Sequence, residues 1–369
     1  QSPQTGDSLF ADTRYGYKTW QIKADNTVEW IGDDFENYFT FGVQASTQER
    51  TATRPGTAIA MPAHPQGTEN KLGIFAQNEY IWDEKLTLIA GARGDFHWVT
   101  PNGIDRPKID GAAISPKLAA LYQVNDTLGV FGSLAHTERL PTIDELYSVS
   151  AAKSASLGLQ KEQANTVEGG FTLSGYDLLQ SGDGASIKTT GFYSDLTDLI
   201  VSNTGSGVPY YGNVGEAHIY GVEVEGSYDS DTFFGSLAYS LTVGDNLVTD
   251  TPLTTVPQSR LVATLGAKNA EWGLSYGARV TLADVGRYIS PEIVASPGRP
   301  PQKVADGPAE AFATLDLFAS WKPDYGAFAG TELTAGIDNV FNADYRENLS
   351  IDRSTGRTFK LTLAKQFDY

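Results

Sequence analysis

Several segments of this 369-residue chain carry side chains suited to holding a flat or metal-bearing ligand. Met61 and His64 lie close together, and thioether and imidazole groups are common axial ligands of porphyrin iron. Tyr147, Tyr210 and Tyr211 fall in predicted outer loops, where exposed rings stack on a chelate or contact a protein partner. The alternatives are an incidental histidine in a loop and ordinary packing of the tyrosines within loops.

Two sets of charged residues admit more than one interpretation. Arg139 can form paired hydrogen bonds with a ligand carboxylate, or a structural ion pair with an acidic residue of the protein. Glu223 and Glu225 alternate along the chain, so they lie on one face of an extended segment. They can be read as paired catalytic carboxylates, but solvated charge on the wet face of a strand fits the alternation better. Arg139 therefore stays a ligand-binding candidate, and no residue is predicted to be catalytic.

The chain carries none of the common catalytic patterns. GxSxG, HExxH, Walker and dinucleotide-binding patterns are absent, and no Ser–His–Asp set is apparent. There are no cysteines, which excludes disulfide scaffolds and thiolate metal sites. The 45 acidic and 27 basic residues give a net charge of −18, which disfavours a nucleic-acid partner. We therefore predict a protein that is not an enzyme and binds no nucleic acid.

The elements that position these residues are predicted to be β-strands. The 38 glycines, 18 tyrosines and single methionine fit an all-β fold, and no apolar run is long enough for a membrane-spanning helix. From Phe359 onward the odd positions are mostly apolar and the even positions mostly polar. This period of two places the two sets on opposite faces of a strand, and the pattern recurs along the chain.

Three properties of these segments indicate a membrane barrel. The predicted strands run about 11–15 residues, whereas soluble strands average about 5–6 and a tilted transmembrane strand needs about 9–11. Their polar faces carry full charges in mid-strand, such as Arg93 and Asp95. Trp20 and Trp30 bracket one apolar face as an interfacial girdle does. A transmembrane antiparallel β-barrel is predicted, and a large soluble sandwich or propeller is the alternative.

The strand count predicts an incomplete barrel. The predicted strands are 17–31, 37–52, 71–82, 85–99, 113–123, 127–138, 163–174, 185–201, 214–229, 231–244, 258–268, 271–285, 311–322, 331–343 and 355–369. Short turns and long loops alternate between them, but closed bacterial barrels normally have an even number of strands. We therefore expect residues 1–369 to be the C-terminal portion of one barrel. Residues 1–16 would begin it in an outer loop, and residues 139–162 would form a long outer loop.

Four stretches of the chain carry recognisable motifs. Residues 139–147 resemble a "FRAP" box, and residues 157–170 resemble the box that opens the following strand. The positions that match these two boxes are Arg139, Pro141, Glu145, Leu146, Tyr147, Glu162, Glu168 and Gly170. Residues 213–225 resemble an N…GxE segment, and residues 338–369 resemble a closing strand pair. Together and in this order, the four stretches resemble TonB-dependent outer-membrane receptors, in particular their heme and hemoglobin branch.

The resemblance implies a barrel of roughly 22 strands, of which this chain would supply the last fifteen. It implies a receptor in the Gram-negative outer membrane that binds heme or a ferric chelate on outer loops and takes it up with energy from TonB. The ligand is then transported cargo rather than a covalently bound cofactor. The implied partners are outer-membrane lipid, an N-terminal plug with the remaining strands in a separate or missing fragment, and TonB acting through that N-terminal part.

The sequence departs from the heme branch in one region. Residues 139–162 contain no histidine, although heme receptors usually carry one between the two boxes, and residues 154–157 replace the usual start of the second box. A ferric siderophore or another metal complex is therefore the alternative ligand. A passive porin and a surface-binding barrel are further alternatives.

Overall fold

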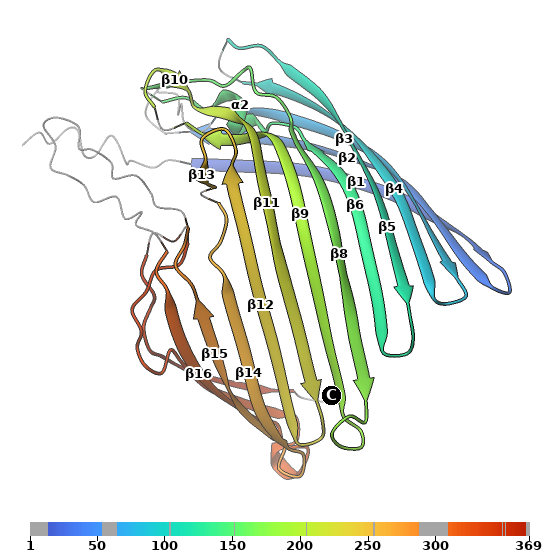
Figure 1. Cartoon of the computed structure of the whole chain (residues 1–369). Coiled ribbons are helices and arrows are strands. Elements are labelled where there is room, and N and C mark those ends of the chain that lie inside the picture. Colours follow the sequence, from blue (N-terminus) through green and yellow to red (C-terminus); the bar gives the residue numbers. More distant parts are fainter. Residues whose placement is uncertain are drawn as a thin grey trace, which may run out of the picture. The chain divides into compact units, whose positions relative to one another are not determined.

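A computed structural model describes residues 14–53, 65–102, 105–150, 152–203, 205–253, 255–287, 309–348, 350 and 352–366 (Figure 1). Met61 and His64 lie outside the described residues, so their role as iron ligands stays a prediction. The first strand begins at Arg14, within the expected opening loop of residues 1–16. Residues 14–16 of that expected loop therefore belong to the first strand.

The described chain is built of long strands with short elements in the connections. The strands of the main path are β1 (Arg14–Ile31), β2 (Phe35–Thr53), β3 (Gly67–Trp82), β4 (Leu86–Pro101), β5 (Ile109–Gln123), β6 (Leu128–Arg139), β8 (Glu162–Tyr176), β9 (Gly184–Ser202), β11 (Tyr211–Asp229), β12 (Phe233–Asn246), β14 (Arg260–Asn269), β15 (Leu274–Ala283), β16 (Phe312–Trp321), β17 (Thr331–Asp338) and β18 (Thr358–Lys365). The connections hold α2 (Ile143–Tyr147), β7 (Lys153–Ser154), β10 (Val208–Pro209), β13 (Thr251–Pro252) and the 3-10 turn η1 (Gly326–Phe328). Among the described residues, no helix is long and apolar enough to cross a membrane.

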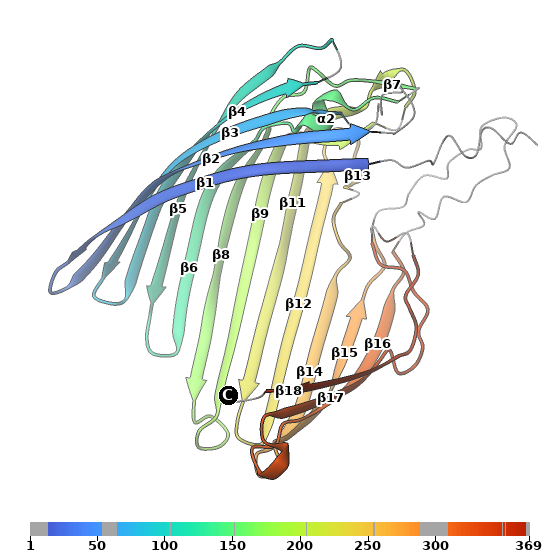
Figure 2. The ribbon, with the colours of Figure 1, turned by 180° about the vertical axis from the view of Figure 1, so that it is seen from behind.

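The strands pair in chain order from β1 to β18 to form one sheet, with β13 as a side branch on β12. The described residues thus contain the fifteen predicted strands, and the prediction of an all-β antiparallel fold is confirmed. Several registers run without a break along nearly the whole of both strands. β1 pairs with β2 from Arg14↔Thr53 to Ile31↔Glu36, and β14 pairs with β15 from Arg260↔Ala283 to Asn269↔Leu274. Figure 2 shows β17 and β18 continuing the order after β16.

One predicted strand, 331–343, is too long. β17 ends at Asp338 because Asn339 and Asn342 have positive φ angles of 51° and 55°, which extended backbone does not allow. The Asn339 side chain stabilises the turn by accepting from Ala343 N and donating to Ala343 O, both at 2.8 Å. Asn339 and Asn342, at the start of the fourth stretch, therefore mark the end of a strand.

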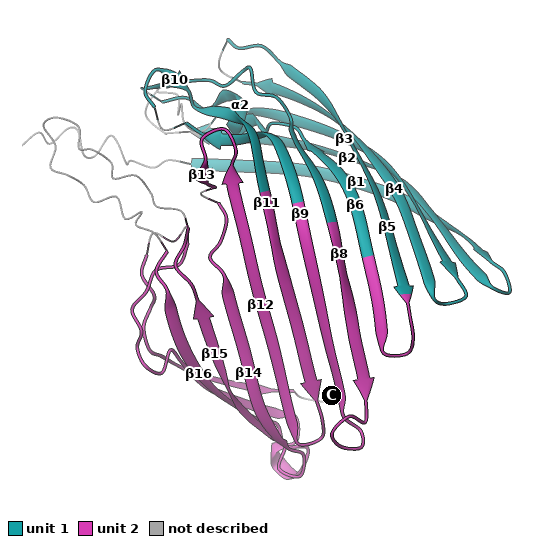
Figure 3. Ribbon diagram, in the orientation of Figure 1, with its two compact units in different colours: residues 1–122, 132–167, 194–218 teal, residues 123–131, 168–193, 219–369 magenta. Residues whose placement is uncertain are grey.

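The chain divides into two compact units, which Figure 3 colours separately. Unit 1 comprises residues 1–122, 132–167 and 194–218, and unit 2 comprises residues 123–131, 168–193 and 219–369.

In unit 1 the two faces of the sheet differ sharply in polarity. Trp20, Ile22 and Trp30 on β1 are exposed by 67%, 71% and 51%. The two tryptophans are ten residues apart, roughly 33 Å of strand, and a tilt of about 45° makes this roughly 23 Å of membrane depth. The opposite face carries ion pairs, including Arg93 with Asp95 at 2.7 Å. The apolar band matches the lipid-facing height of about 25 Å in outer-membrane barrels.

In unit 2, phenylalanine rings on the polar face cover glycines of neighbouring strands. A Cβ at Gly170 would lie 2.0 Å from Thr189 O and 2.6 Å from the Phe131 ring. A Cβ at Gly221 would lie 2.2 Å from Leu241 O and contact the Phe192 ring. The matched glycines of the second and third family stretches are therefore required by close packing.

Candidate functional site

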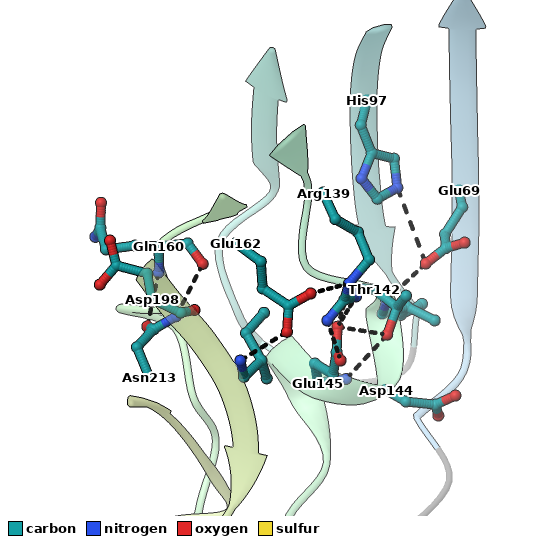
Figure 4. Close-up of polar contacts among 12 residues, drawn as sticks. Glu69, His97, Arg139, Thr142, Asp144, Glu145, Gln160, Glu162, Asp198 and Asn213 are labelled. Atoms are coloured by element: carbon teal, nitrogen blue, oxygen red, sulfur yellow. Dashed lines mark hydrogen bonds and ion pairs between the residues drawn. The ribbon is translucent and has the colours of Figure 1, made fainter. Parts of the chain in front are cut away.

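A short helix, α2, organises the segment that follows β6. Thr142 and Glu145 form a capping box, in which Thr142 Oγ1 accepts from Glu145 N at 3.4 Å and Glu145 Oε2 accepts from Thr142 N at 2.8 Å. Figure 4 shows both residues beside the guanidinium of Arg139. The expected loop of residues 139–162 is therefore ordered at its start by a helix.

Arg139 joins the first two family boxes. Its two terminal nitrogens donate to the two carboxylate oxygens of Glu145, each at 2.9 Å, and its Nε donates to Glu162 (Figure 4). Glu162 also accepts from Ile200 N at 2.7 Å. Arg139 therefore forms the structural ion pair, which was one of its two interpretations. Its Nε and both terminal nitrogens donate to carboxylates of the protein itself.

The helix is also tied to strands far away in the sequence. Asp144 accepts from Arg50 near the end of β2, and Ile143 N donates to Glu69 of β3 at 2.6 Å. His97 of β4 lies beside Glu69, with 3.9 Å between Nε2 and Oε1 (Figure 4). Among the described residues, His97 Nε2 has no hydrogen-bond partner. Sequence analysis missed Arg50 and Glu69, since their partners on α2 are remote in the chain.

The apolar residues of α2 build a small core. Ile143, Leu146 and Tyr147 recur at helical spacing and pack with Val99 of β4. Tyr147 is only 1% exposed, and its hydroxyl donates to Pro107 O at 2.6 Å. The expectation that Tyr147 is an exposed ligand-binding ring is therefore wrong, because the helix turns the ring toward the wall.

The other two candidate tyrosines lie beside a small two-stranded ladder. β7 pairs in parallel with β10, and Tyr210 and Tyr211 follow β10 directly. Their rings are half-buried with centroids 5.2 Å apart, and the ammonium group of Lys153 lies 4.9 Å from the Tyr210 centroid. Tyr211 N donates to Ser156 Oγ at 2.7 Å. Lys153, which sequence analysis missed, makes this cluster both aromatic and cationic.

Asn213 connects the second and third family stretches. Its side chain accepts from Gln160 N at 3.0 Å and donates to Gln160 O at 3.1 Å (Figure 4). It also donates to Asp198 O. The first three of the four stretches are thus linked to one another by hydrogen bonds among residues of unit 1.

Of the remaining candidates, Glu168, Glu223 and Glu225 are exposed on strands β8 and β11. Within the described ranges, no group of three or more His, Cys, Asp and Glu side chains is arranged to hold a metal ion. The described residues around α2, β7 and β10 therefore present tyrosine rings, a lysine ammonium group and carboxylates, and no metal-binding cluster.

Burial and hydrogen bonding around α2 shift the pKa values of Glu145 and Tyr147. Burial disfavours the charged form of Glu145, but hydrogen bonds from Arg139 and Thr142 N outweigh it, so the pKa of Glu145 lies below its ordinary value. Burial raises the pKa of Tyr147, opposed by the positive charge of Arg106. The site therefore holds an ionised Glu145 beside a neutral Tyr147 at neutral pH.

Acid should loosen α2. A depressed folded-state pKa gives stability that is complete above the ordinary value of 4.5 and is lost as pH falls through the folded value. We expect hydrogen-exchange protection of residues 142–147, corrected for intrinsic rates, to be constant from neutral pH to about pH 5 and to decline below about pH 4. Glu145→Gln should remove much of this acid dependence, and a decline already complete at about pH 6 would contradict the assignment.

Residues 1–340 match the family described as "TonB dependent receptor-like, beta-barrel". This chain belongs to that family. The match confirms the resemblance inferred from the four stretches, and the family is one of transport receptors rather than enzymes. In this TonB-dependent receptor, the apolar and polar faces of the sheet are the two faces of a barrel wall.

Curated relatives of this TonB-dependent receptor include proteins named for heme. TonB-dependent heme receptor A of Haemophilus ducreyi is 26% identical over 358 residues, which cover 82% of this chain and 46% of the relative. The hemin receptor of Yersinia pestis is 26% identical over 368 residues, covering 94% of this chain and 50% of the relative. The chain thus spans about half the length of the curated relatives it matches.

Solved structures share the fold of this TonB-dependent receptor. A double mutant of the Serratia marcescens hemophore receptor HasR, in complex with its hemophore HasA and heme, matches with a TM-score of 0.77 and 19% identity over 96% of this chain and 60% of that chain. The copper transporter OprC matches with a TM-score of 0.72 and 18% identity, over 94% and 56%. At such identities the likeness establishes the fold alone.

Proposed function

We propose that this chain is part of the wall of a Gram-negative outer-membrane receptor that takes up heme with energy delivered by TonB. The observation that carries the proposal is the family match over residues 1–340, together with relatives named as heme and hemin receptors. The apolar band on β1 supports contact with membrane lipid. The plug, the TonB-contacting segment and the further strands of a barrel of about 22 belong to this proposal as parts of the receptor outside residues 1–369.

Within the chain, the ligand-contacting surface is assigned to Lys153, Tyr210 and Tyr211, with α2 as a fixed support beside it. Half-buried tyrosine rings offer flat surface to a porphyrin. The ammonium group of Lys153 donates to Asn203 O and lies over the Tyr210 ring, and its remaining N–H donors can pair with a propionate. Arg139 and Tyr147 act as positioning residues, because their polar groups already have protein partners. Met61 and His64 stay candidate iron ligands.

A ferric chelate is the second candidate ligand. Residues 139–162 lack a histidine, and the Tyr210–Tyr211 pair would also stack on an aromatic chelate. The ferric-catecholate import receptor Fiu shares the fold, with a TM-score of 0.70 and 15% identity. The two candidate ligands are distinguished by testing whether hemin or a ferric catecholate binds to the purified full-length receptor.

Tyr210→Ala should weaken hemin binding by about threefold to tenfold, the worth of one aromatic contact. Tyr210→Phe should keep most of the affinity, since stacking needs the ring alone. The measurement is titration of the detergent-solubilised full-length receptor with hemin, followed by its absorbance, with ferric enterobactin as the comparison. Equal affinities for the parent and Tyr210→Ala would remove Tyr210 from the site, and binding of the catecholate alone would replace heme as the ligand.

Energy coupling is tested separately in cells. Hemin uptake should stop when the inner-membrane proton gradient is collapsed, whereas surface binding of hemin should persist. Uptake that continues without the gradient would favour a passive porin and overturn the proposal.

A further inference from the structure

Unit 2 contains a cavity that the tyrosine cluster of unit 1 does not use. Its volume is about 860 Å³, within the range of about 300–1,000 Å³ that is typical of small-molecule sites. One wall is the polar face of strands β14 to β18. The other is formed by described residues of the connection between β17 and β18, namely 345, 347, 348, 350 and 352–356. The cavity therefore lies against the wet side of the barrel wall.

The connection that closes this cavity is held in place by charged groups. Arg353 donates to both carboxylate oxygens of Glu310, at 3.0 and 2.8 Å, and to Asp344 at 2.6 Å. Asn348 N donates to Gln258 at 3.2 Å. The cavity is thus preformed, which lowers the entropy cost of binding.

A stacked aromatic pair packs the same connection, through Tyr345, against Phe312 of β16. The Tyr345 ring lies 3.7 Å from the Phe312 ring, centroid to centroid, at an angle of 14°. Arg260 lies over the Phe312 ring at 5.8 Å, so this pair also places one of the cavity's guanidinium groups.

Most carboxylates of the cavity are already engaged. Asp316 accepts from Asn339 N at 2.8 Å, and Asp338 pairs with Lys360. Glu347 contacts Arg260 at 3.4 Å. Asp352, which is exposed, is the carboxylate without a side-chain partner among the described lining residues.

Of the three guanidinium groups in the lining, Arg353 is fully engaged, whereas those of Arg279 and Arg260 are not. Arg279 has no hydrogen-bond or ion-pair partner in the part of unit 2 that the structure describes, although Asp316 is its register neighbour on β16. Among the described residues, the only polar partner of the Arg260 guanidinium is Glu347, at 3.4 Å. The two arginines are on adjacent strands, four register positions apart, or roughly 13 Å along the strand. Their long side chains can reach into the same cavity.

From this arrangement we infer that the cavity is a second binding site for a small carboxylate-bearing solute, with Arg279 and Arg260 as its carboxylate donors. A guanidinium fork binds a carboxylate through two parallel hydrogen bonds, and Thr281 and Thr314 of the lining add hydroxyl groups. The inference rests on the proposed function in one respect: on the wall of a receptor, this site would hold the cargo after its capture by the outer segments. A heme propionate and the carboxylate of a ferric chelate have the required chemistry.

The first test measures occupancy without any transport. The solubilised full-length receptor is treated with phenylglyoxal, which modifies free guanidinium groups, and modification of Arg279 and Arg260 is followed by mass spectrometry. Citrate should slow modification of Arg279 at least about fivefold, whereas glucose should leave it unchanged. Arg93, which is paired with Asp95, is the internal control. Equal modification of Arg279 with and without citrate would overturn the inference, whether or not the receptor takes up heme.

The second test measures the role of the site in uptake. Arg279→Gln should leave surface binding of hemin by de-energised cells within about twofold of the parent and lower energised hemin uptake by about tenfold. Hemin dimethyl ester, which lacks free carboxylates, should not discriminate between the parent and Arg279→Gln. Lys188→Gln removes a cation on β9 that lies over the Phe131 ring, outside the cavity, and should leave uptake unchanged.

Two outcomes of this second test would count against the inference. Unchanged hemin uptake by Arg279→Gln would show that the site is not used. Sensitivity of Arg279→Gln cells to vancomycin would show that the cavity normally holds a polypeptide that seals the barrel. Absence of hemin uptake by the parent would instead contradict the proposed function, and the citrate protection experiment would still decide the present inference.

Discussion

Tyr147→Ala should detach α2 from the wall of unit 1. The side chain is 1% exposed and packs with Ile143, Leu146 and Val99, so its removal leaves a cavity in the only buried apolar cluster of the described residues. Truncating a buried aromatic side chain costs about 3–5 kcal/mol, more than a five-residue helix can supply alone. We expect residues 140–150 to become cleavable by protease in the folded receptor, and hemin affinity to fall by at least about tenfold as the support beside Tyr210 is lost.

Two variants show whether packing is the cause. Tyr147→Phe removes only the hydrogen bond to Pro107 O and should cost about 1 kcal/mol. Tyr176→Ala removes an 83% exposed ring on β8 and should have no effect on the protease pattern. If Tyr147→Ala and the parent receptor were cleaved at the same rate, α2 would not depend on this core.

Arg139→Met should have the second-largest effect. The substitution keeps much of the side-chain volume but leaves Glu145 and Glu162 without their shared cation, so two like charges face each other. Because the Arg139 side chain is 42% exposed, we discount the cost of a fully buried pair to about 1.5–3 kcal/mol. Hydrogen exchange of residues 142–147 should accelerate by roughly tenfold to a hundredfold.

A double substitution separates charge from packing. Arg139→Met with Glu162→Gln removes one of the two facing charges and should recover part of the protection, as coupled neighbours do. Arg93→Met breaks an ion pair of similar exposure on β4 and is the matched control. If Arg139→Met exchanged no faster than Arg93→Met in residues 142–147, the ion-pair network would not hold the helix.

The strands could be predicted from sequence because their signal is local. Alternation along Phe359 to Lys365 reports directly which side faces lipid, and the predicted limits of most strands agree with the structure to within a few residues. The exception at β17 came from two asparagines whose left-handed conformation carries no periodic signal. Family stretches supplied the positions of Arg139 and Glu162 but not what these residues contact.

The arrangement around α2 could not be predicted because its partners are distant in the chain. Arg50 and Asp144 are 94 positions apart, and Glu69 and Ile143 are 74 apart, so only pairing of the intervening strands brings them together. One local signal was overlooked. Ile143, Leu146 and Tyr147 have the i, i+3, i+4 spacing of a helix face, which argues for a buried Tyr147.

The same long separations bear on how the polypeptide matures. A five-residue helix is not stable by itself, so α2 can settle only after β2, β3 and β6 have found their registers, late in folding. Resistance of residues 140–150 to cleavage would then report that assembly of the sheet has finished, and would distinguish mature molecules from stalled assembly intermediates.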